Sequence, residues 1–414
     1  MRLGVGVDHC SSKRYSLKIV AGSGIGLVVL LVSAPVNADQ FDTLNYTAAV
    51  GEAYDDNLFR LPSWVDPQSA IGKSTTSDRI QTESIGINLD KKYSLQEVIF
   101  NANVTKNQFH TFSNLNYFNT AYSGTWNWKI GTRLSGALSD TRTQTLNSFT
   151  DIHTYTRNLS TVDTRHLDAD WWIDGNWHAL SGASLSRSTN SQSVVNNQSA
   201  NTWSDEWGLK YVPADGNSIS LISRVIHNRY INGTLNYYLL VDTDGTEYQK
   251  ELRFNWMLTG KSQLSGNLTN IDHRFPTFYQ RNYGGTLGGL SYFWGVSGKT
   301  ALNVAWNRSI NAWFDLSSTY AISDSVSIAP SWQISARTNL NMSLTYGNAD
   351  YFGPITPYTI ARHDSSRSEA LGLDWSPQRS VKISASVQSS YRSSNYMAYE
   401  YDDTASNLIL TLSF

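Results

Sequence analysis

Two His and two Asp residues lie close together in the chain: Asp151, His153, Asp163 and His166. Imidazole and carboxylate groups in contact could carry out general acid–base catalysis. Catalysis would also need a positioned nucleophile, yet no Gly-rich turn presents one nearby. The chain also lacks an HExxH motif and a phosphate-binding loop. We therefore interpret the four residues as solvated loop polarity and predict a protein that is not an enzyme and carries no metal or cofactor.

A second set of charged residues suggests a different chemistry, namely weak hydrogen bonding to a solute. Each member lies on the polar side of a segment in which polar and apolar residues alternate. A pore selective for anions would cluster Arg and Lys, and a cation pore would carry an acidic ring. Here both signs are mixed among Ser, Thr and Asn, which favours neutral or weakly charged solutes, including sugars. The predicted pore-lining residues are Arg133, Asp168, Asp170, Glu206, Lys210, Glu251, Arg253, Asp374 and Lys382.

The segments that must position these residues are strands, because the alternation has a period of two. Leu340, Met342 and Leu344 alternate with Asn and Ser, and Leu408, Leu410 and Leu412 repeat the pattern near the C-terminus. Segments of about 10 residues match tilted transmembrane strands. A membrane-spanning sheet must close on itself, because an open edge would leave backbone groups unpaired in lipid. The sequence therefore predicts a closed antiparallel transmembrane β-barrel; a large soluble sandwich or solenoid is the alternative.

Composition and the N-terminus agree with an exported chain. Residues 1–38 combine a basic start, an apolar stretch and the small residues Val36 and Ala38, which predicts a cleaved signal peptide. The barrel is then expected over 39–414. Cys10 is the only Cys of the 414 residues, which excludes a disulfide framework. A net charge of −2 gives no support for nucleic-acid binding.

Aromatic residues gather beside the expected short turns, as they do at a membrane interface. The chain also ends on an aromatic residue, a feature similar to the C-terminal signature of outer-membrane barrels, and we expect the outer-membrane assembly machinery to read it. The predicted interface aromatics are Tyr93, Trp128, Trp256, Trp294, Trp332, Trp375 and Phe414.

Eight short turns predict 18 strands, and 16 is the alternative count. The turns fall near 91–95, 128–131, 174–177, 212–217, 257–261, 294–299, 334–337 and 375–379. Pro330 lies inside a predicted strand, and we expect a bulge or a shifted boundary there, because a closed barrel has no edge strand to accommodate it. The longer polar connections are expected at the outer face of the membrane.

One segment resembles a known family. The sequence YDDNLFR, formed by Tyr54, Asp55, Asp56, Asn57, Leu58, Phe59 and Arg60, resembles the opening segment of EpsL-type outer-membrane proteins, which accompany exopolysaccharide operons in bacteria with the exosortase sorting system. The stretch His273–Gly285 is similar to an aromatic and Arg-containing stretch in them. The resemblance implies a porin-like barrel in the outer membrane of a Gram-negative bacterium, with no catalytic residues to transfer.

Three functions follow from these observations. The first, implied by the resemblance, is a channel in exopolysaccharide export, with polysaccharide and periplasmic export machinery as partners beside outer-membrane lipid. The second is a general or sugar-uptake porin. A surface adhesin or receptor is the weaker third reading, and a small outer-membrane protease or acyltransferase is the enzymatic alternative. For export we expect Arg133, Asp170, Lys210 and Arg253 to form a polar track for the saccharide.

Overall fold

The computed structural model describes residues 43–153, 155–192, 199–214, 216–231, 233–313, 315–354 and 359–414. The predicted signal peptide, residues 1–38, lies outside the described residues. Residues 38–414 form one compact unit. In the described part of this unit we find 18 strands and very little helix.

The strands have lengths of 12 to 16 residues. Their bounds are β1 (Leu44–Asp55), β2 (Asp78–Tyr93), β3 (Gln96–Phe109), β4 (Tyr117–Ile130), β5 (Leu134–Leu146), β6 (Leu159–Asp174), β7 (Trp177–Asn190), β8 (Ala200–Tyr211), β9 (Ser218–Tyr230), β10 (Asp244–Thr259), β11 (Ser262–Arg274), β12 (Tyr283–Trp294), β13 (Thr300–Ala312), β14 (Tyr320–Ser335), β15 (Thr338–Phe352), β16 (His363–Gln378), β17 (Val381–Ser394) and β18 (Tyr401–Ser413).

The sheet is a closed barrel. Each strand pairs antiparallel with the strands before and after it in the chain, and β1 also pairs with β18. The register of this last ladder runs from Thr47 opposite Ser413 to Asp55 opposite Ala405. Closure removes both edges, so the backbone groups of the first and last strands are paired. This confirms the predicted fold class and selects 18 strands over 16.

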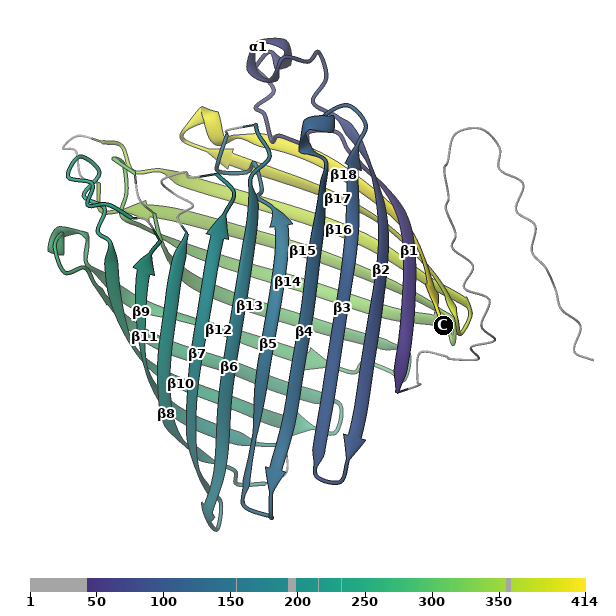
Figure 1. Cartoon of the computed structure of the whole chain (residues 1–414), viewed down its shortest axis with the longest axis vertical. Helices are drawn as coiled ribbons and strands as arrows, with labels where there is room; N and C mark the ends of the chain where they lie inside the picture. The colour runs from purple at the N-terminus through teal and green to yellow at the C-terminus, as the bar shows by residue number, and fades with distance from the viewer. Residues whose placement is uncertain are drawn as a thin grey trace, which may run out of the picture. The chain divides into compact units, whose positions relative to one another are not determined.

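The two ends of the barrel differ in the length of their connections (Figure 1). Short turns join β2 to β3 and every second pair after it, at one end. The other end carries the longer loops, the first of which contains α1 (Pro67–Ile71). A crossing strand needs only about 9–11 residues, so strands of 12 to 16 residues project beyond the membrane on the loop side. In barrels of this kind short turns face the periplasm.

The helices are single turns in the loops. Besides α1 they are the 3-10 turns η1 (Ser113–Leu115), η2 (Tyr279–Arg281) and η3 (Met397–Tyr399). Asp66 caps α1 by accepting hydrogen bonds from the N–H groups of Gln68 and Ser69. Among the described residues, none of the helices has the length and apolar character needed to cross a membrane.

The expectation of a bulge or shifted boundary at Pro330 was wrong. β14 runs through this residue, and Pro330 lies opposite Leu302 of β13. On the β15 side the pairs at 329 and 330 drop out, yet the register is the same before and after the gap, from Ile328 opposite Leu344 to Ser331 opposite Asn341. Proline removes one ladder donor but can keep the extended backbone, so the sheet absorbs it without inserting a residue. The irregularity of β14 lies later, between Gln333 and Ser335.

Candidate functional site

Alternation along the strands sorts side chains between the outer wall and the channel. On β6, Leu167 and Trp171 are exposed on the outer wall, with 46% and 54% of their surface accessible. Asp168 and Asp170 alternate with them and therefore face the channel. The same rule places every predicted pore-lining residue except Arg133 on channel-facing positions. Arg133 lies in the turn before β5, where its guanidinium stacks over Trp172 with 5.4 Å between the guanidinium carbon and the ring centroid.

A first group of channel-facing charges joins β6, β7 and β8. His178 Nδ1 lies 2.6 Å from Asp170 Oδ1, and Lys210 Nζ forms an ion pair with the other carboxylate oxygen of Asp170. The strand register brings these three side chains together. Asp170 lies beside Leu180 on β7, two residues from His178, and His178 lies directly opposite Lys210. A depression of about 520 Å³ lies beside Asp168 and Asp170. These charges neutralise one another while remaining within reach of solvent.

A second group joins β8, β9 and β10 around Arg224. Its Nε and Nη2 donate to Glu206 Oε2 at 2.8 and 2.6 Å, and its Nη1 donates to Gln249 at 2.6 Å. Glu251, only 7% exposed, accepts from Arg253 at 3.0 Å. Sequence reasoning found Glu206, Glu251 and Arg253 but missed Arg224. The sequence contains the information needed to find it. Leu221 and Val225 mark the apolar side of this alternating segment, and Arg224 lies on the other, channel-facing side.

Several of the remaining channel-facing charges are also paired. His273 Nδ1 lies 3.0 Å from Glu247 Oε2, and Lys382 Nζ lies 3.2 Å from Asp374 Oδ1. The corresponding positions of β12 to β15 carry no ionisable group below the mouth. They include amide and hydroxyl residues such as Asn303, whose side chain accepts from Ser291 at 2.9 Å, together with Gly, Ala and the apolar Leu287 and Phe293. The channel therefore has a stretch of wall in which most charges are paired, and next to it an uncharged stretch that mixes hydrogen-bonding and apolar side chains.

The mouth of the barrel is crossed by the loop between β5 and β6. Asp151 in this loop accepts from Arg362 at 3.1 Å and from Arg392 at 2.8 Å. Arg362 immediately precedes β16, and Arg392 belongs to β17. Because β6 and β16 are far apart around the barrel in either direction, these contacts can form only across the opening. We call Asp151, Arg362 and Arg392 the cross-mouth latch.

Within the latch, Arg362 is surrounded by buried side chains. Arg362 is 3% exposed, donates to Asp364 at 3.0 Å through Nε, and lies over the Tyr399 ring at 3.5 Å and the Tyr351 ring at 4.3 Å. Burial opposes the charge of Arg362, but the bond to Asp364 and the nearby Tyr351 and Asp151 outweigh it and raise its pKa above the ordinary value. Arg362 is therefore a fixed cation at the mouth.

The YDDNLFR segment also lies at the mouth. Arg60 pairs with Asp55 at 2.9 Å and with Asp403 of β18 at 3.2 Å. The Asn57 amide donates to the backbone oxygens of Leu61 and Asp402, each at 2.9 Å. These contacts fasten the first loop to the last strand. The structure thus gives the segment a structural role where β1 meets β18.

Aromatic side chains pack the loops against one another. Phe59 is 1% exposed, and its ring centroid lies 4.7 Å from those of both Phe112 and Phe149. These rings come from three different loops, after β1, β3 and β5. Together with Leu61 and Leu115 they form a buried apolar cluster. The loop that carries Asp151 is therefore anchored on its own side of the barrel before it reaches across.

A second loop cluster surrounds Arg281 of η2, which is 1% exposed. Its guanidinium donates to the backbone oxygens of Leu239, Asp315 and Ser318 at 2.6, 2.9 and 2.7 Å, and to the Thr319 hydroxyl at 2.9 Å. No carboxylate of the described residues forms an ion pair with it, and burial lowers the pKa of Arg281 to about 10. We call this arrangement the carbonyl cage.

The His and Asp residues considered for catalysis do not converge. Asp163 pairs with Arg142 on the outer wall, whereas His166 alternates with it and faces the channel. His153 stacks between Tyr155 and Tyr399. Asp151 is held by two buried arginines, so its interpretation as solvated loop polarity was wrong. No group of three His, Cys, Asp or Glu side chains within the described ranges could hold a metal ion.

The predicted interface aromatics lie close to the short turns. The exposed fractions are 78% for Tyr93, 42% for Trp294, 49% for Trp332, 47% for Trp375 and 44% for Phe414. Trp128 and Trp256 are half-buried, and neither belongs to a packed core. Phe414 exchanges backbone hydrogen bonds with Tyr46 at 2.8 and 2.9 Å. Alternation places Phe414 on the outer wall with Leu412 and Leu410.

The apolar outer wall, the closed sheet and the polar channel define an outer-membrane β-barrel of Gram-negative type with a porin-like fold. No protein-family model and no curated protein matches the chain. Among solved structures it is similar to OccAB3 of Acinetobacter baumannii, at 10% identity and a TM-score of 0.50, with 90% of this chain and 99% of that chain covered. It is also similar to the outer membrane protein OpdK of Pseudomonas aeruginosa, at 13% identity and a TM-score of 0.48, covering 91% and 100%. At 10% identity the likeness to OccAB3 shows the fold alone.

Proposed function

We propose that the barrel is a porin that admits small, neutral, polar solutes such as mono- and disaccharides. The cross-mouth latch is the observation that carries this proposal, because a loop held across the opening divides it and sets a size limit. The channel wall supports the choice of solute. Most of its charges are paired with one another, and its amide and hydroxyl groups can exchange hydrogen bonds with sugar hydroxyls at little net cost.

The test is permeation of the purified barrel in lipid vesicles. Vesicle swelling should be fast with a monosaccharide, slower with a disaccharide and absent with a long oligosaccharide. The double variant Arg362→Gln/Asp151→Asn should admit larger sugars, because the loop loses its ion pairs with the opposite wall. A folded wild type that admits no sugar, or one that admits long and short sugars equally, would refute the proposal.

Exopolysaccharide export is the second candidate function. The resemblance of the Tyr54–Arg60 segment to EpsL-type proteins favours it. In this case the polymer would slide along the channel-facing groups near Asp170, Lys210 and Arg253, with Arg133 at the periplasmic rim. Deleting the gene should then abolish surface polysaccharide, and a folded variant with Ala at these four positions should slow its secretion. Unchanged polysaccharide in the deletion strain would eliminate this candidate.

A further inference from the structure

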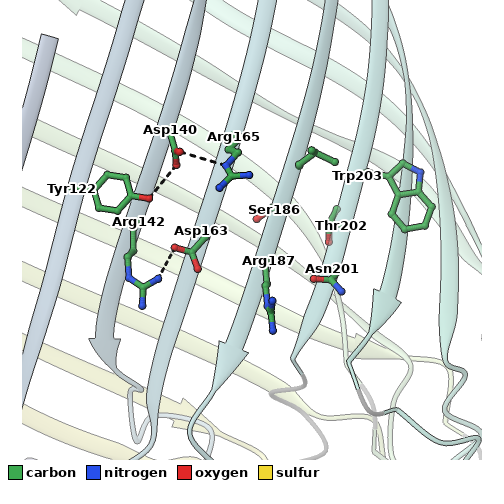
Figure 2. A pocket seen from close by; sticks show the side chains of 11 residues that line it. Tyr122, Asp140, Arg142, Asp163, Arg165, Ser186, Arg187, Asn201, Thr202 and Trp203 are labelled. Atoms are coloured by element: carbon green, nitrogen blue, oxygen red, sulfur yellow. Dashed lines mark hydrogen bonds and ion pairs between the residues drawn. The ribbon is translucent and has the colours of Figure 1, made fainter.

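The outer wall of β5 to β8 carries an unusual row of ionic side chains. Strand register places Arg142, Asp163, Arg187 and Asn201 directly beside one another across four strands. The next row toward the short turns contains Asp140, Arg165, Leu185 and Trp203. Figure 2 shows these side chains in front of their strands, with the opposite wall of the barrel behind them. The two rows therefore lie outside the channel.

The rows line a depression of about 520 Å³. Within it Arg142 Nη1 lies 2.9 Å from Asp163 Oδ1, and Arg165 reaches Asp140 only through Nε, at 3.4 Å. Arg187 has no hydrogen-bond or ion-pair partner among the described residues. Three guanidinium groups against two carboxylates leave the depression with a positive charge and with N–H donors that no group in the described part of the chain uses.

Two other arginines on the outer wall, Arg308 and Arg274, are neutralised more completely. Arg308 makes two short contacts with Asp324, at 2.9 Å through Nε and 2.7 Å through Nη2. Arg274 makes two contacts with Asp272 at 2.9 and 2.6 Å. Bidentate contacts of this kind use the donors that would otherwise bind an external anion. Arg187 has no such contact among the described residues, so its donors remain free within the depression.

The position of the depression along the barrel indicates what it contacts. Arg142 lies eight residues from the short-turn end of β5, and Arg187 lies ten residues from that end of β7. With the rise of a tilted strand these distances correspond to about 20–26 Å, close to the height of about 25 Å expected for the apolar band. Exposed Leu138 and Leu167 lie on the short-turn side of the arginines. The arginines therefore lie at the headgroup level of the outer leaflet.

We propose that this depression binds the phosphorylated headgroup of an outer-leaflet glycolipid. Arg187 and Arg165 would contact a phosphate, with Arg142 beside them, since guanidinium groups match the geometry of phosphate oxygens. Exposed Leu185 and Trp203 would lie against the sugar and the start of an acyl chain. A lipid is the occupant because only a membrane component contacts the apolar rows and the charged row together, as basic lipid-headgroup sites on membrane proteins do.

The experiment compares lipids bound to the purified full-length barrel by native mass spectrometry. The probes are a lipid A that carries both phosphates, the same lipid A with its phosphates removed, phosphatidylglycerol and free inorganic phosphate. The wild type should bind the phosphorylated lipid A at least tenfold more tightly than the other three. The variant Arg142→Gln/Arg165→Gln/Arg187→Gln should lose at least tenfold in that affinity, and Arg187→Gln alone should lose severalfold.

The matched control is Arg308→Gln/Arg274→Gln, which removes two outer-wall arginines that are already paired and should leave lipid binding unchanged. Arg187 has no hydrogen-bond or ion-pair partner to lose within the described ranges, so Arg187→Gln keeps the test valid if the triple variant does not fold. Heat-modifiable gel mobility reports folding. Equal binding of the phosphorylated and dephosphorylated lipid A would overturn the proposal. So would equal binding of phosphatidylglycerol or free phosphate, or full binding by a folded Arg187→Gln variant.

Discussion

Two of the buried arginines at the mouth, Arg281 and Arg362, stabilise their buried guanidinium groups in opposite ways. Arg281 lies in the carbonyl cage and joins neighbouring loops on one side of the rim. Arg362 pairs with carboxylates, and one of these, Asp151, comes from across the opening and is 35% exposed. A cage of uncharged oxygens is insensitive to salt and pH near neutrality, whereas a partly exposed ion pair responds to both. Arg281 therefore stabilises the loops on one side of the rim, whereas Arg362 holds the β5–β6 loop, which can move away from the opening.

Replacing Arg281 should give the largest effect. In Arg281→Met, three backbone oxygens and the Thr319 hydroxyl lose their donor in a buried place, which should cost about 3–5 kcal/mol of unfolding free energy. Urea titration of the barrel in lipid vesicles measures it. The control Arg274→Met removes an exposed arginine and should cost less than about 1 kcal/mol. Equal losses of unfolding free energy in the two variants would contradict the conclusion that Arg281 stabilises the loops of the rim.

Replacing Asp151 should affect conduction more than stability. Asp151→Ala leaves Arg362 paired with Asp364, and leaves Arg392 bonded to the backbone oxygens of Tyr399 and Thr150. The loss of unfolding free energy should therefore be only about 1 kcal/mol. The loop loses both of its ion pairs with the opposite wall and keeps only the bond from Arg392 to the Thr150 backbone oxygen, so single-channel conductance in planar bilayers should rise severalfold. Asp350→Ala, which removes an exposed carboxylate paired with His363, should leave conductance unchanged. If Asp151→Ala conducts like the wild type, the latch does not control the mouth.

In the unmodified protein, salt should weaken the contacts of Arg362 and leave those of Arg281 unchanged. Raising the ionic strength from about 0.1 to 1 M shortens the screening length from about 10 to 3 Å. Open-state occupancy of the wild type should then increase by a factor of about two, and that of Asp151→Ala should not change. The free energy attributed to Arg281, measured as wild type minus Arg281→Met, should be the same at both salt concentrations. If this free-energy difference depended on salt, charge pairing would contribute to the stability of the carbonyl cage, contrary to the prediction.

The smallest effect should come from pH through His153 in the crossing loop. Burial, with Arg392 second, lowers the pKa of His153 below its usual value, so the docked loop holds it neutral. In the released loop the imidazole titrates near pH 6.5. Docking should therefore be strongest above about pH 6.5 and weaken as the pH falls below it. Open-state occupancy measured between pH 7.5 and 5 should rise slightly in the wild type and stay flat in His153→Gln.

The barrel could be predicted from the sequence because the alternation within each strand shows which of its faces points outward. Leu340, Met342 and Leu344 reveal both a strand and its outward face, and the same phase places Asp170 and Lys210 in the channel. The cross-mouth latch has no such signal. Asp151 and Arg362 are 211 residues apart in loops without periodicity, and only the closed sheet brings those loops to one opening. The ionic rows on β5 to β8 were also missed, because a predicted lipid-facing position was expected to be apolar at every height.

The seam between β1 and β18 has a consequence for the order of folding. Every other ladder of the described barrel joins strands that follow each other in the chain, whereas this one joins the first to the last. The hydrogen bond from Asn57 to Asp402 spans 345 residues. Contacts of such high sequence separation form slowly, because the intervening chain must be ordered first. The bonds of Asn57 and Arg60 to the last strand therefore cannot exist in a partly inserted chain, and their formation marks the completed molecule.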